Sequence, residues 1–403
     1  MKYDFTSVFD RVDSIAVTPE ANPNFRKFTL KEGFDKIPMW IADMNFHACP
    51  TIPAAVIKRT EHTTYGYFPT RDEYYDAIIN WHQTRKPIEG LSREHIGYEN
   101  GVLGGVASAL GVFCQQGEAV LVHSPTYVGF TATLTNAGYK IVHSELYQDE
   151  NNIWRMDYAD MEKKIVENKI HTAIFCSPHN PAGRVWEREE LETAMALFEK
   201  YEINIIADEI WSDIIMPGYT HIPTQAVSEY AKQHTVAMYA PSKTFNLAGL
   251  IGAYHIIFNK NIRERVEKQG SLSHYNSQNV LSMYALIGAY SPEGHEWADE
   301  LCEVIEGNLN YGGNYIKEHF HGLKFSQPQG TYMLYVDCEE WCKEHNKTID
   351  DILDRAYTYG ALFQDGRPFR RPYALRINFA LPLSRVQEAF DRLDKYVFNN
   401  TEW

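Results

Sequence analysis

The sequence predicts an α/β protein with two parts, a large domain built on a mostly parallel sheet and a smaller α+β domain. With 403 residues, the chain is long enough for two or three domains of ordinary size. Between about residues 50 and 285, short apolar runs alternate with amphipathic stretches, a pattern typical of strands buried beneath helices on both faces. We therefore expect 50–285 to form the large domain, and 1–49 together with 286–403 to form the small one.

Each apolar run of the large domain is short enough to be one buried strand. Between two of these runs, Leu191, Met195 and Phe198 share one stripe at helical spacing, which predicts an amphipathic helix over 186–201. The candidate strands are 119–122, 140–142, 172–176, 203–207, 235–239 and 253–258. After Tyr290 we expect a long helical stretch, then a strand at 331–336, a polar helix near 348–359, a strand at 375–379 and a final helix at 384–397.

Composition and charge narrow the class of partner. Hydrophobic residues make up 44% of the chain and charged residues 23%, which is ordinary for a folded globular protein. A net charge of −15 opposes broad contact with nucleic acid or anionic lipid, so we expect a small-molecule partner. The first ten residues resemble neither a secretory signal nor a membrane anchor, which predicts a cytoplasmic protein. The spacing of cysteines and histidines indicates reduced thiols and no metal site.

Lys243 is the most informative single residue, because it follows the candidate strand 235–239 in the segment YAPSKTFNLAG. Ligands of open α/β sheets bind at the carboxyl ends of the strands. Partial burial disfavours the charged form of a lysine, so its amine can act as a nucleophile and form a Schiff base with an aldehyde. The same Ser-Lys-Thr sequence also suits a solvated turn, so the assignment needs other residues to support it.

Two polar residues follow neighbouring candidate strands. Asp208 comes directly after 203–207, where its carboxylate could keep the pyridine nitrogen of pyridoxal phosphate protonated and so make the ring an electron sink. The alternative role for Asp208 is a helix N-cap. Asn180 lies in CSPHNPAGRV after 172–176, where its amide could donate to the phenolic oxygen of that cofactor. Asn-Pro is also a common start of a turn.

Two further motifs supply a phosphate site and a flat ring. The segment GVLGG at 101–105 begins an apolar helical stretch, and the free amides of a helix N-terminus bind phosphate readily. Tyr127, in SPTY, could stack on a flat cofactor, although a tyrosine there could equally fill the core. Because these motifs occur at the ends of successive elements in one domain, together they indicate one common site.

Six motifs spread over nearly the whole chain carry a family resemblance. They are PMWIADMNF at 38–46, YGYF at 65–68, CSPHNPAGRVW at 176–186, APSKTFNLAG at 240–249, QGTY at 329–332 and LRINFA at 375–380. With these motifs the chain resembles the fold-type I pyridoxal-phosphate enzymes of the aspartate aminotransferase superfamily. It is most similar to the MalY/PatB group of cystathionine β-lyases and C-S lyases, including the cystalysin type. The resemblance implies a PLP-dependent transferase-like large domain with pyridoxal 5'-phosphate (PLP) as cofactor.

The resemblance also implies roles for single residues around the cofactor. Lys243 would be the Schiff-base lysine and Asp208 the partner of the pyridine nitrogen, with Asn180 as donor to the ring hydroxyl. Tyr127 would stack on the ring and belong to the catalytic set. The phosphate would be held by the amides of Val102 and Leu103, the hydroxyl of Ser242 and, from a neighbouring subunit, Tyr67. This last assignment implies a homodimer with shared active sites.

Arg376 in LRINFA matches the arginine that receives the substrate α-carboxylate in this family, with Asn180 as a second substrate contact. Just before it, the segment QDGRPFRRPY at 364–373 departs from the family pattern. Its arginines, Arg367, Arg370 and Arg371, crowd the approach to Arg376. Such a charge run suits a solvated surface. It would also suit a substrate with a second anionic group.

The reaction that the resemblance implies is α,β-elimination from L-cystathionine or a related cysteine S-conjugate. Lys243 would act as general base on the α-proton, and the products would be a thiol, pyruvate and ammonia. Transamination of an L-amino acid is the alternative, because the same residues would serve it. A third possibility is a regulatory or binding protein that keeps the fold without catalysis.

Overall fold

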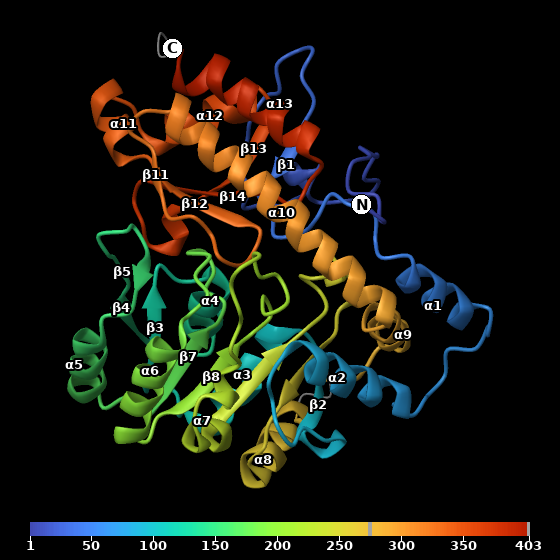
Figure 1. Cartoon of the computed structure of the whole chain (residues 1–403). Coiled ribbons are helices and arrows are strands. Elements are labelled where there is room, and N and C mark those ends of the chain that lie inside the picture. The colour runs from blue at the N-terminus through green and yellow to red at the C-terminus, as the bar shows by residue number, and fades with distance from the viewer. Residues whose placement is uncertain (273–275, 401–403) are drawn as a thin grey trace.

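The computed structural model describes residues 1–272 and 276–400 and contains two large sheets, each covered by helices (Figure 1). In Figure 1 the smaller of these sheets, with its helices, lies above the larger one. Within the described ranges, every helix is too short or too polar to cross a bilayer. Sheets covered by helices confirm the predicted α/β class.

The larger sheet has the strand order β2-β10-β9-β8-β7-β3-β4. Among these strands only β10 runs antiparallel to its neighbours, so the carboxyl ends of the other six meet at one edge. The mostly parallel sheet is therefore confirmed. The bounds are β2 (Ile96–Glu99), β3 (Ala119–Ser124), β4 (Lys140–Glu145), β7 (Thr172–Cys176), β8 (Asn204–Asp208), β9 (Thr235–Tyr239) and β10 (Ala253–Ile256).

The central strands are buried on both faces, because successive side chains enter two different hydrophobic clusters. Ile205 packs with Phe198 on one face, while Ile206 packs with Val106 on the other. The first face carries α5 (Tyr158–Asn168), α6 (Arg188–Lys200) and α7 (Glu229–His234), and the second α3 (Val102–Phe113), α4 (Val128–Asn136) and α8 (Lys260–Ser271). Helix α6 begins two residues later than predicted, because Glu187 and Glu190 form a capping box at its start.

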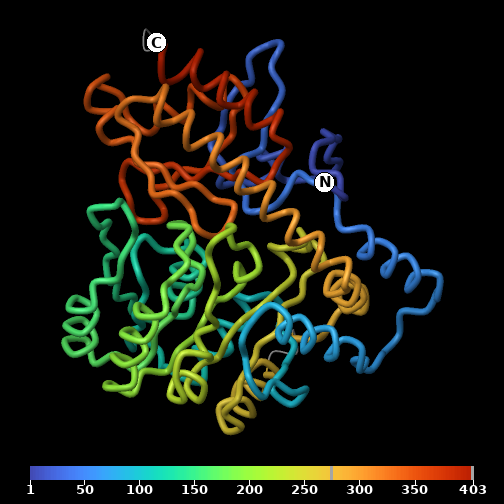
Figure 2. The backbone as a smooth tube through the Cα atoms, viewed as in Figure 1, coloured from blue at the N-terminus to red at the C-terminus, as the bar shows by residue number. Residues whose placement is uncertain are grey.

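The smaller sheet has the order β1-β13-β14-β12-β11 and joins the two ends of the chain. Strand β1 pairs with β13 in parallel, and Figure 2 shows the blue N-terminal segment beside the red C-terminal one. The strands are β1 (Ile37–Met39), β11 (Lys324–Phe325), β12 (Met333–Asp337), β13 (Ala361–Asp365) and β14 (Ala374–Asn378). The accompanying helices are α10 (Pro292–His319), α11 (Glu339–His345), α12 (Ile349–Thr358) and α13 (Leu383–Leu393), followed by a π-helical turn at Asp394–Phe398.

Strand β12 begins two residues later than predicted. Thr331 has a φ of 68°, in the left-handed region, and a strand cannot pass through that conformation.

The remaining elements lie outside the two large sheets. They include α1 (Thr51–Thr60) and α2 (Asp72–Arg85), which both pack against α9 (Val280–Ala289), and the paired short strands β5 (Tyr147–Gln148) and β6 (Trp154–Arg155).

Candidate functional site

The candidate cofactor residues of the large domain come together where the parallel strands end. Their positions follow from the fold, since each occupies the end of a strand of the larger sheet or the loop or helix that follows it. Asp208 ends β8, Lys243 lies in the loop after β9, Asn180 lies in the turn after β7, Tyr127 caps α4 after β3, and Val102 and Leu103 begin α3 after β2.

Lys243 lies at the border between the protein interior and solvent. Its Nζ donates a hydrogen bond to the backbone carbonyl of Ala42 at 2.9 Å and lies 5.6 Å from the ring centroid of Trp211. Burial, and next the charge of Arg376, lower the pKa of Lys243 to about 8, while Asp43 and Asp208 oppose this shift. At a given pH the amine is therefore neutral, and nucleophilic, more often than that of an exposed lysine.

Asp208 is a buried carboxylate, and its charge is only partly compensated. Its Oδ1 accepts a hydrogen bond from the Ile210 amide at 3.1 Å. Burial raises the pKa of Asp208 to about 6, against the smaller opposing effects of this hydrogen bond and of Lys243. A cationic N–H placed against the carboxylate would offset the cost of burying its charge.

Tyr127 connects the strand ends with the helix that follows β2. Its ring packs over Gly129, because a Cβ added there would lie 2.4 Å from Cε1 of Tyr127 and 2.9 Å from Cδ1 of Leu103. Burial raises the pKa of the Tyr127 hydroxyl, with Arg376 and Asp208 acting on it in opposite directions. The phenol thus lies within electrostatic reach of both charged groups.

The N-terminus of α3 is open to an anion. Gly101, which as a glycine has no capping side chain, precedes the helix with a φ of 89°. The amides that begin a helix and the helix dipole both favour a negative group at such a position. Ser242 lies in the same loop as Lys243, in a turn that the Leu247 amide closes by donating to the Ser242 carbonyl at 3.1 Å.

Arg376 reaches the site from β14 of the smaller sheet. Its Nη1 donates to Oδ1 of Asn180 at 3.0 Å, and its guanidinium lies 4.7 Å from the ring centroid of Phe369. Burial lowers the pKa of Arg376 to about 10, so the side chain stays charged at neutral pH. Its Nε is buried without a hydrogen-bond partner among the described residues. A desolvated, incompletely paired guanidinium is a receptor for a carboxylate.

Comparison with known proteins identifies the family of this chain. Residues 36–393 match the family model described as aminotransferase class I and II. The chain belongs to this family. Cystathionine beta-lyase PatB of Bacillus subtilis (strain 168) is 31% identical over 303 residues, which cover 75% of this chain and 78% of that protein.

Two solved structures match nearly the whole chain. Cystalysin from Treponema denticola, which contains PLP, has a TM-score of 0.88 at 29% identity and covers 98% of both chains. A PLP-bound putative aminotransferase from Clostridium difficile 630 has a TM-score of 0.89 at 29% identity, covering 98% of this chain and 99% of its own. The expected fold of PLP-dependent enzymes is thereby confirmed.

The segment 42–44 contacts the loop that carries Lys243, although its sequence alone indicated no role for it. Besides the Ala42 carbonyl, it contains Asp43, whose two oxygens accept from Arg11 at 3.1 and 2.7 Å. The side chain of Asn246, three residues after Lys243, accepts from the Met44 amide at 3.0 Å and donates to the Met44 carbonyl at 2.9 Å. The family motif at 38–46 contains this segment, but its contact with the lysine loop depends on the tertiary fold.

The arginines of the 364–373 segment have structural partners. Arg367 pairs with Asp350 and Asp365 at 2.6 and 2.8 Å, Arg370 lies 3.6 Å from Glu145, and Arg371 donates to the Leu146 carbonyl at 3.1 Å. These contacts favour a role in holding the loop over binding of a second anionic group. Tyr67, by contrast, is fully exposed in the loop between α1 and α2, so the single chain does not bring it to its own site.

The lowered pKa of Lys243 predicts an unusual pH dependence of its chemical reactivity. In protein freed of bound aldehydes with hydroxylamine, acetylation of Lys243 should rise with pH and reach half its maximal rate near pH 8, as followed by mass spectrometry of peptides. Asp43→Asn should move this midpoint to lower pH, because the carboxylate favours the charged amine.

Exposed Lys2 provides the internal control in the same digests. Its contact with Glu296 raises its pKa, so its acetylation should still be increasing where that of Lys243 has levelled off. A common midpoint for the two lysines would contradict the proposed desolvation of Lys243.

Proposed function

We propose that this protein is a PLP-dependent C-S β-lyase acting on L-cystathionine or a related cysteine S-conjugate. The observation that carries the proposal is the meeting of Lys243, Asp208, Asn180 and Arg376 at one site. The 31% identical relative named cystathionine beta-lyase supports this reaction for the site. The products would be a thiol, pyruvate and ammonia.

The residues at the site fit PLP by charge and shape. Asp208 would accept a hydrogen bond from the ring nitrogen, and Asn180 would donate to the phenolic oxygen while Tyr127 stacks on the ring. The open N-terminus of α3, with the amides of Val102 and Leu103 and the hydroxyl of Ser242, would hold the phosphate. When bound, this cofactor supplies an electron sink for negative charge at the substrate α-carbon.

The protein side of the reaction depends on orienting the substrate and moving one proton. Arg376 would bind the α-carboxylate, since its guanidinium is charged, buried and incompletely paired. This contact, with Asn180 beside it, fixes how the α-carbon lies relative to Lys243. The neutral amine of Lys243 is then the general base that takes the α-proton on Nζ.

The same proposal includes a homodimer in which Tyr67 completes the partner's phosphate site. Large side chains are exposed along α1 and the loop after it, including Ile57 at 59%, Tyr65 at 56% and Tyr67. Such a patch is typical of a surface that another protein covers. A cytoplasmic setting belongs to the proposal as well, because a reducing compartment would keep the six free cysteines as thiols.

Transamination is the second candidate function. The description of the matched family model is aminotransferase class I and II. One solved structure of similar fold is named a putative aminotransferase. The residues that bind cofactor and α-carboxylate would be the same in both reactions. The distinction therefore rests on the products.

The lyase proposal predicts that the purified protein releases pyruvate and a thiol from L-cystathionine without any α-keto acid. Lys243→Ala should reduce the rate at least about a hundredfold, because the general base is lost. Pyruvate is measured with lactate dehydrogenase and the thiol with a disulfide dye. Turnover that requires an α-keto acid would instead establish transamination, and a protein without either activity or visible cofactor absorbance would be a binding protein.

The shared-site proposal predicts that two impaired variants complement each other in a mixed dimer. Lys243→Ala and Tyr67→Ala subunits, co-expressed with different tags and purified as mixed dimers, should regain part of the pyruvate release. One of the two sites then receives Lys243 from one subunit and Tyr67 from the other. Mixed dimers of Lys243→Ala with Asp208→Ala are the control, since both residues belong to the same chain's site. Equal activity in the two mixtures would disprove shared sites.

A further inference from the structure

The hydroxyl of Tyr332 is buried without a hydrogen-bond partner. The side chain is 0% exposed, and its oxygen has no donor or acceptor among the described residues. An unpaired buried hydroxyl costs free energy, and the large majority of such groups in native proteins are paired. This oxygen therefore calls for a partner that is not part of the polypeptide.

The surroundings of Tyr332 place it at the candidate site. Its ring packs edge to face on Trp211 with centroids 4.7 Å apart, and the same indole lies 5.6 Å from Nζ of Lys243. Its carbonyl accepts from the Phe379 amide at 2.8 Å, directly after the strand that carries Arg376. Tyr332 therefore lies between Trp211, which contacts Lys243, and the residue that follows β14.

Three charges act on the Tyr332 phenol. Burial raises its pKa, Asp43 raises it further, and Arg376 and Arg11 oppose these effects. A phenol in this environment stays protonated and acts as a donor. Both carboxylate oxygens of Asp43 accept from Arg11, and among the described residues no hydrogen bond joins Asp43 to the Tyr332 hydroxyl. An anion bound beside Arg376 would supply an acceptor for this hydroxyl.

The backbone before Tyr332 is strained. Thr331 is β-branched, yet it has a φ of 68°, where side chains with a branched Cβ are rarely found. Its amide donates to the Ile214 carbonyl at 2.9 Å, and its Oγ1 accepts from the Met333 amide at 3.1 Å. Such strain persists only where the surrounding contacts fix the conformation.

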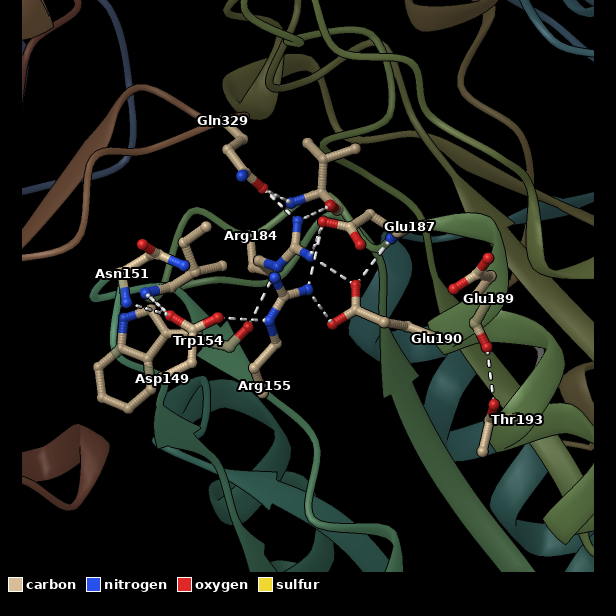
Figure 3. A network of polar contacts seen from close by, with 12 residues as sticks. Asp149, Asn151, Trp154, Arg155, Arg184, Glu187, Glu189, Glu190, Thr193 and Gln329 are labelled. Carbon is tan, nitrogen blue, oxygen red and sulfur yellow. Dashed lines mark hydrogen bonds and ion pairs between the residues drawn. The ribbon is translucent and has the colours of Figure 1, made fainter.

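Hydrogen bonds around the buried side chain of Arg184 hold the turn that precedes Tyr332. Figure 3 shows Arg184 and Gln329 pointing toward each other, and Oε1 of Gln329 accepts from Arg184 and from the Val185 amide. Arg184 is itself held by Glu187, Glu190 and the Trp154 carbonyl (Figure 3). The Gln329 and Gly330 amides both donate to the Gly183 carbonyl, at 2.8 and 3.1 Å. The turn 329–332 is thus fixed to the loop between β7 and α6.

We propose that the Tyr332 hydroxyl donates a hydrogen bond to the α-carboxylate of the amino-acid substrate, beside Arg376. The strained and anchored turn holds the donor in position before the substrate arrives. A carboxylate has room for this bond, because its two oxygens accept more hydrogen bonds than one guanidinium supplies. The inference rests on the proposed function, since it takes Arg376 as the receptor of the carboxylate.

The test compares Tyr332→Phe with Tyr335→Phe in the holoenzyme. Tyr335 is a matched control, because it is buried on β12, lies near Arg376, and its hydroxyl already donates to the Gly366 carbonyl at 3.0 Å. Two probes are titrated by visible absorbance: L-alanine, which has no β leaving group, and ethylamine, which also lacks the carboxylate. Thermal unfolding is measured in parallel.

Tyr332→Phe should weaken L-alanine binding roughly tenfold or more, because a hydrogen bond to a charged group is lost. Ethylamine binding should stay unchanged, and the melting temperature should not fall, since the hydroxyl has no partner in the protein to lose. Tyr335→Phe should lower the melting temperature and leave the affinity for L-alanine within about twofold. Unchanged L-alanine binding in Tyr332→Phe, or an equal loss of both probes, would overturn the inference.

The same samples separate this inference from the proposed function. If wild type releases pyruvate from L-cystathionine but Tyr332→Phe binds L-alanine normally, only the inference fails. If wild type binds L-alanine in a Tyr332-dependent way but eliminates nothing, the inference stands and the lyase proposal fails. A wild-type protein that shows no saturable L-alanine binding would overturn the inference together with the role of Arg376.

Discussion

The architecture of the candidate site depends on keeping one amine partly out of water without giving it a direct carboxylate partner. Lys243 donates to a neutral backbone carbonyl, and its pKa is lowered by burial and by Arg376. Lys86 is also buried, but it forms a direct ion pair with Asp213 and therefore has a structural role. The hydrogen bond from Lys243 to the Ala42 carbonyl is broken more easily than such an ion pair, so the amine remains available for reaction.

The rest of the fold fixes what surrounds this amine. Glu209, the residue after Asp208, accepts hydrogen bonds from His221 at 2.9 Å, the Tyr239 hydroxyl at 2.6 Å and the Thr224 amide at 2.7 Å. Because Tyr239 ends β9, this buried carboxylate ties together the two strand ends that carry Asp208 and Lys243. The smaller sheet then adds Arg376 through its contact with Asn180.

The bounds of elements with a strong local pattern could be predicted from the sequence. Strands 172–176 and 235–239 have the predicted bounds, because each is a continuous apolar run buried on both faces. Strand β2 was missed, since Ile96–Glu99 is short and only half buried. The Asn180–Arg376 contact and the unpaired Tyr332 hydroxyl depend on how two sheets meet, which no local pattern records. The domain boundaries and the role of Tyr67 stay predictions.

The most direct test of the account is the site at which PLP attaches to the protein. Borohydride treatment of the purified protein, followed by digestion and mass spectrometry, fixes the cofactor on the amine that holds it. We expect a phosphopyridoxyl group on the peptide that contains Lys243 and an unmodified Lys86. A sample without the group, or with the group on a different lysine, would contradict the central claim.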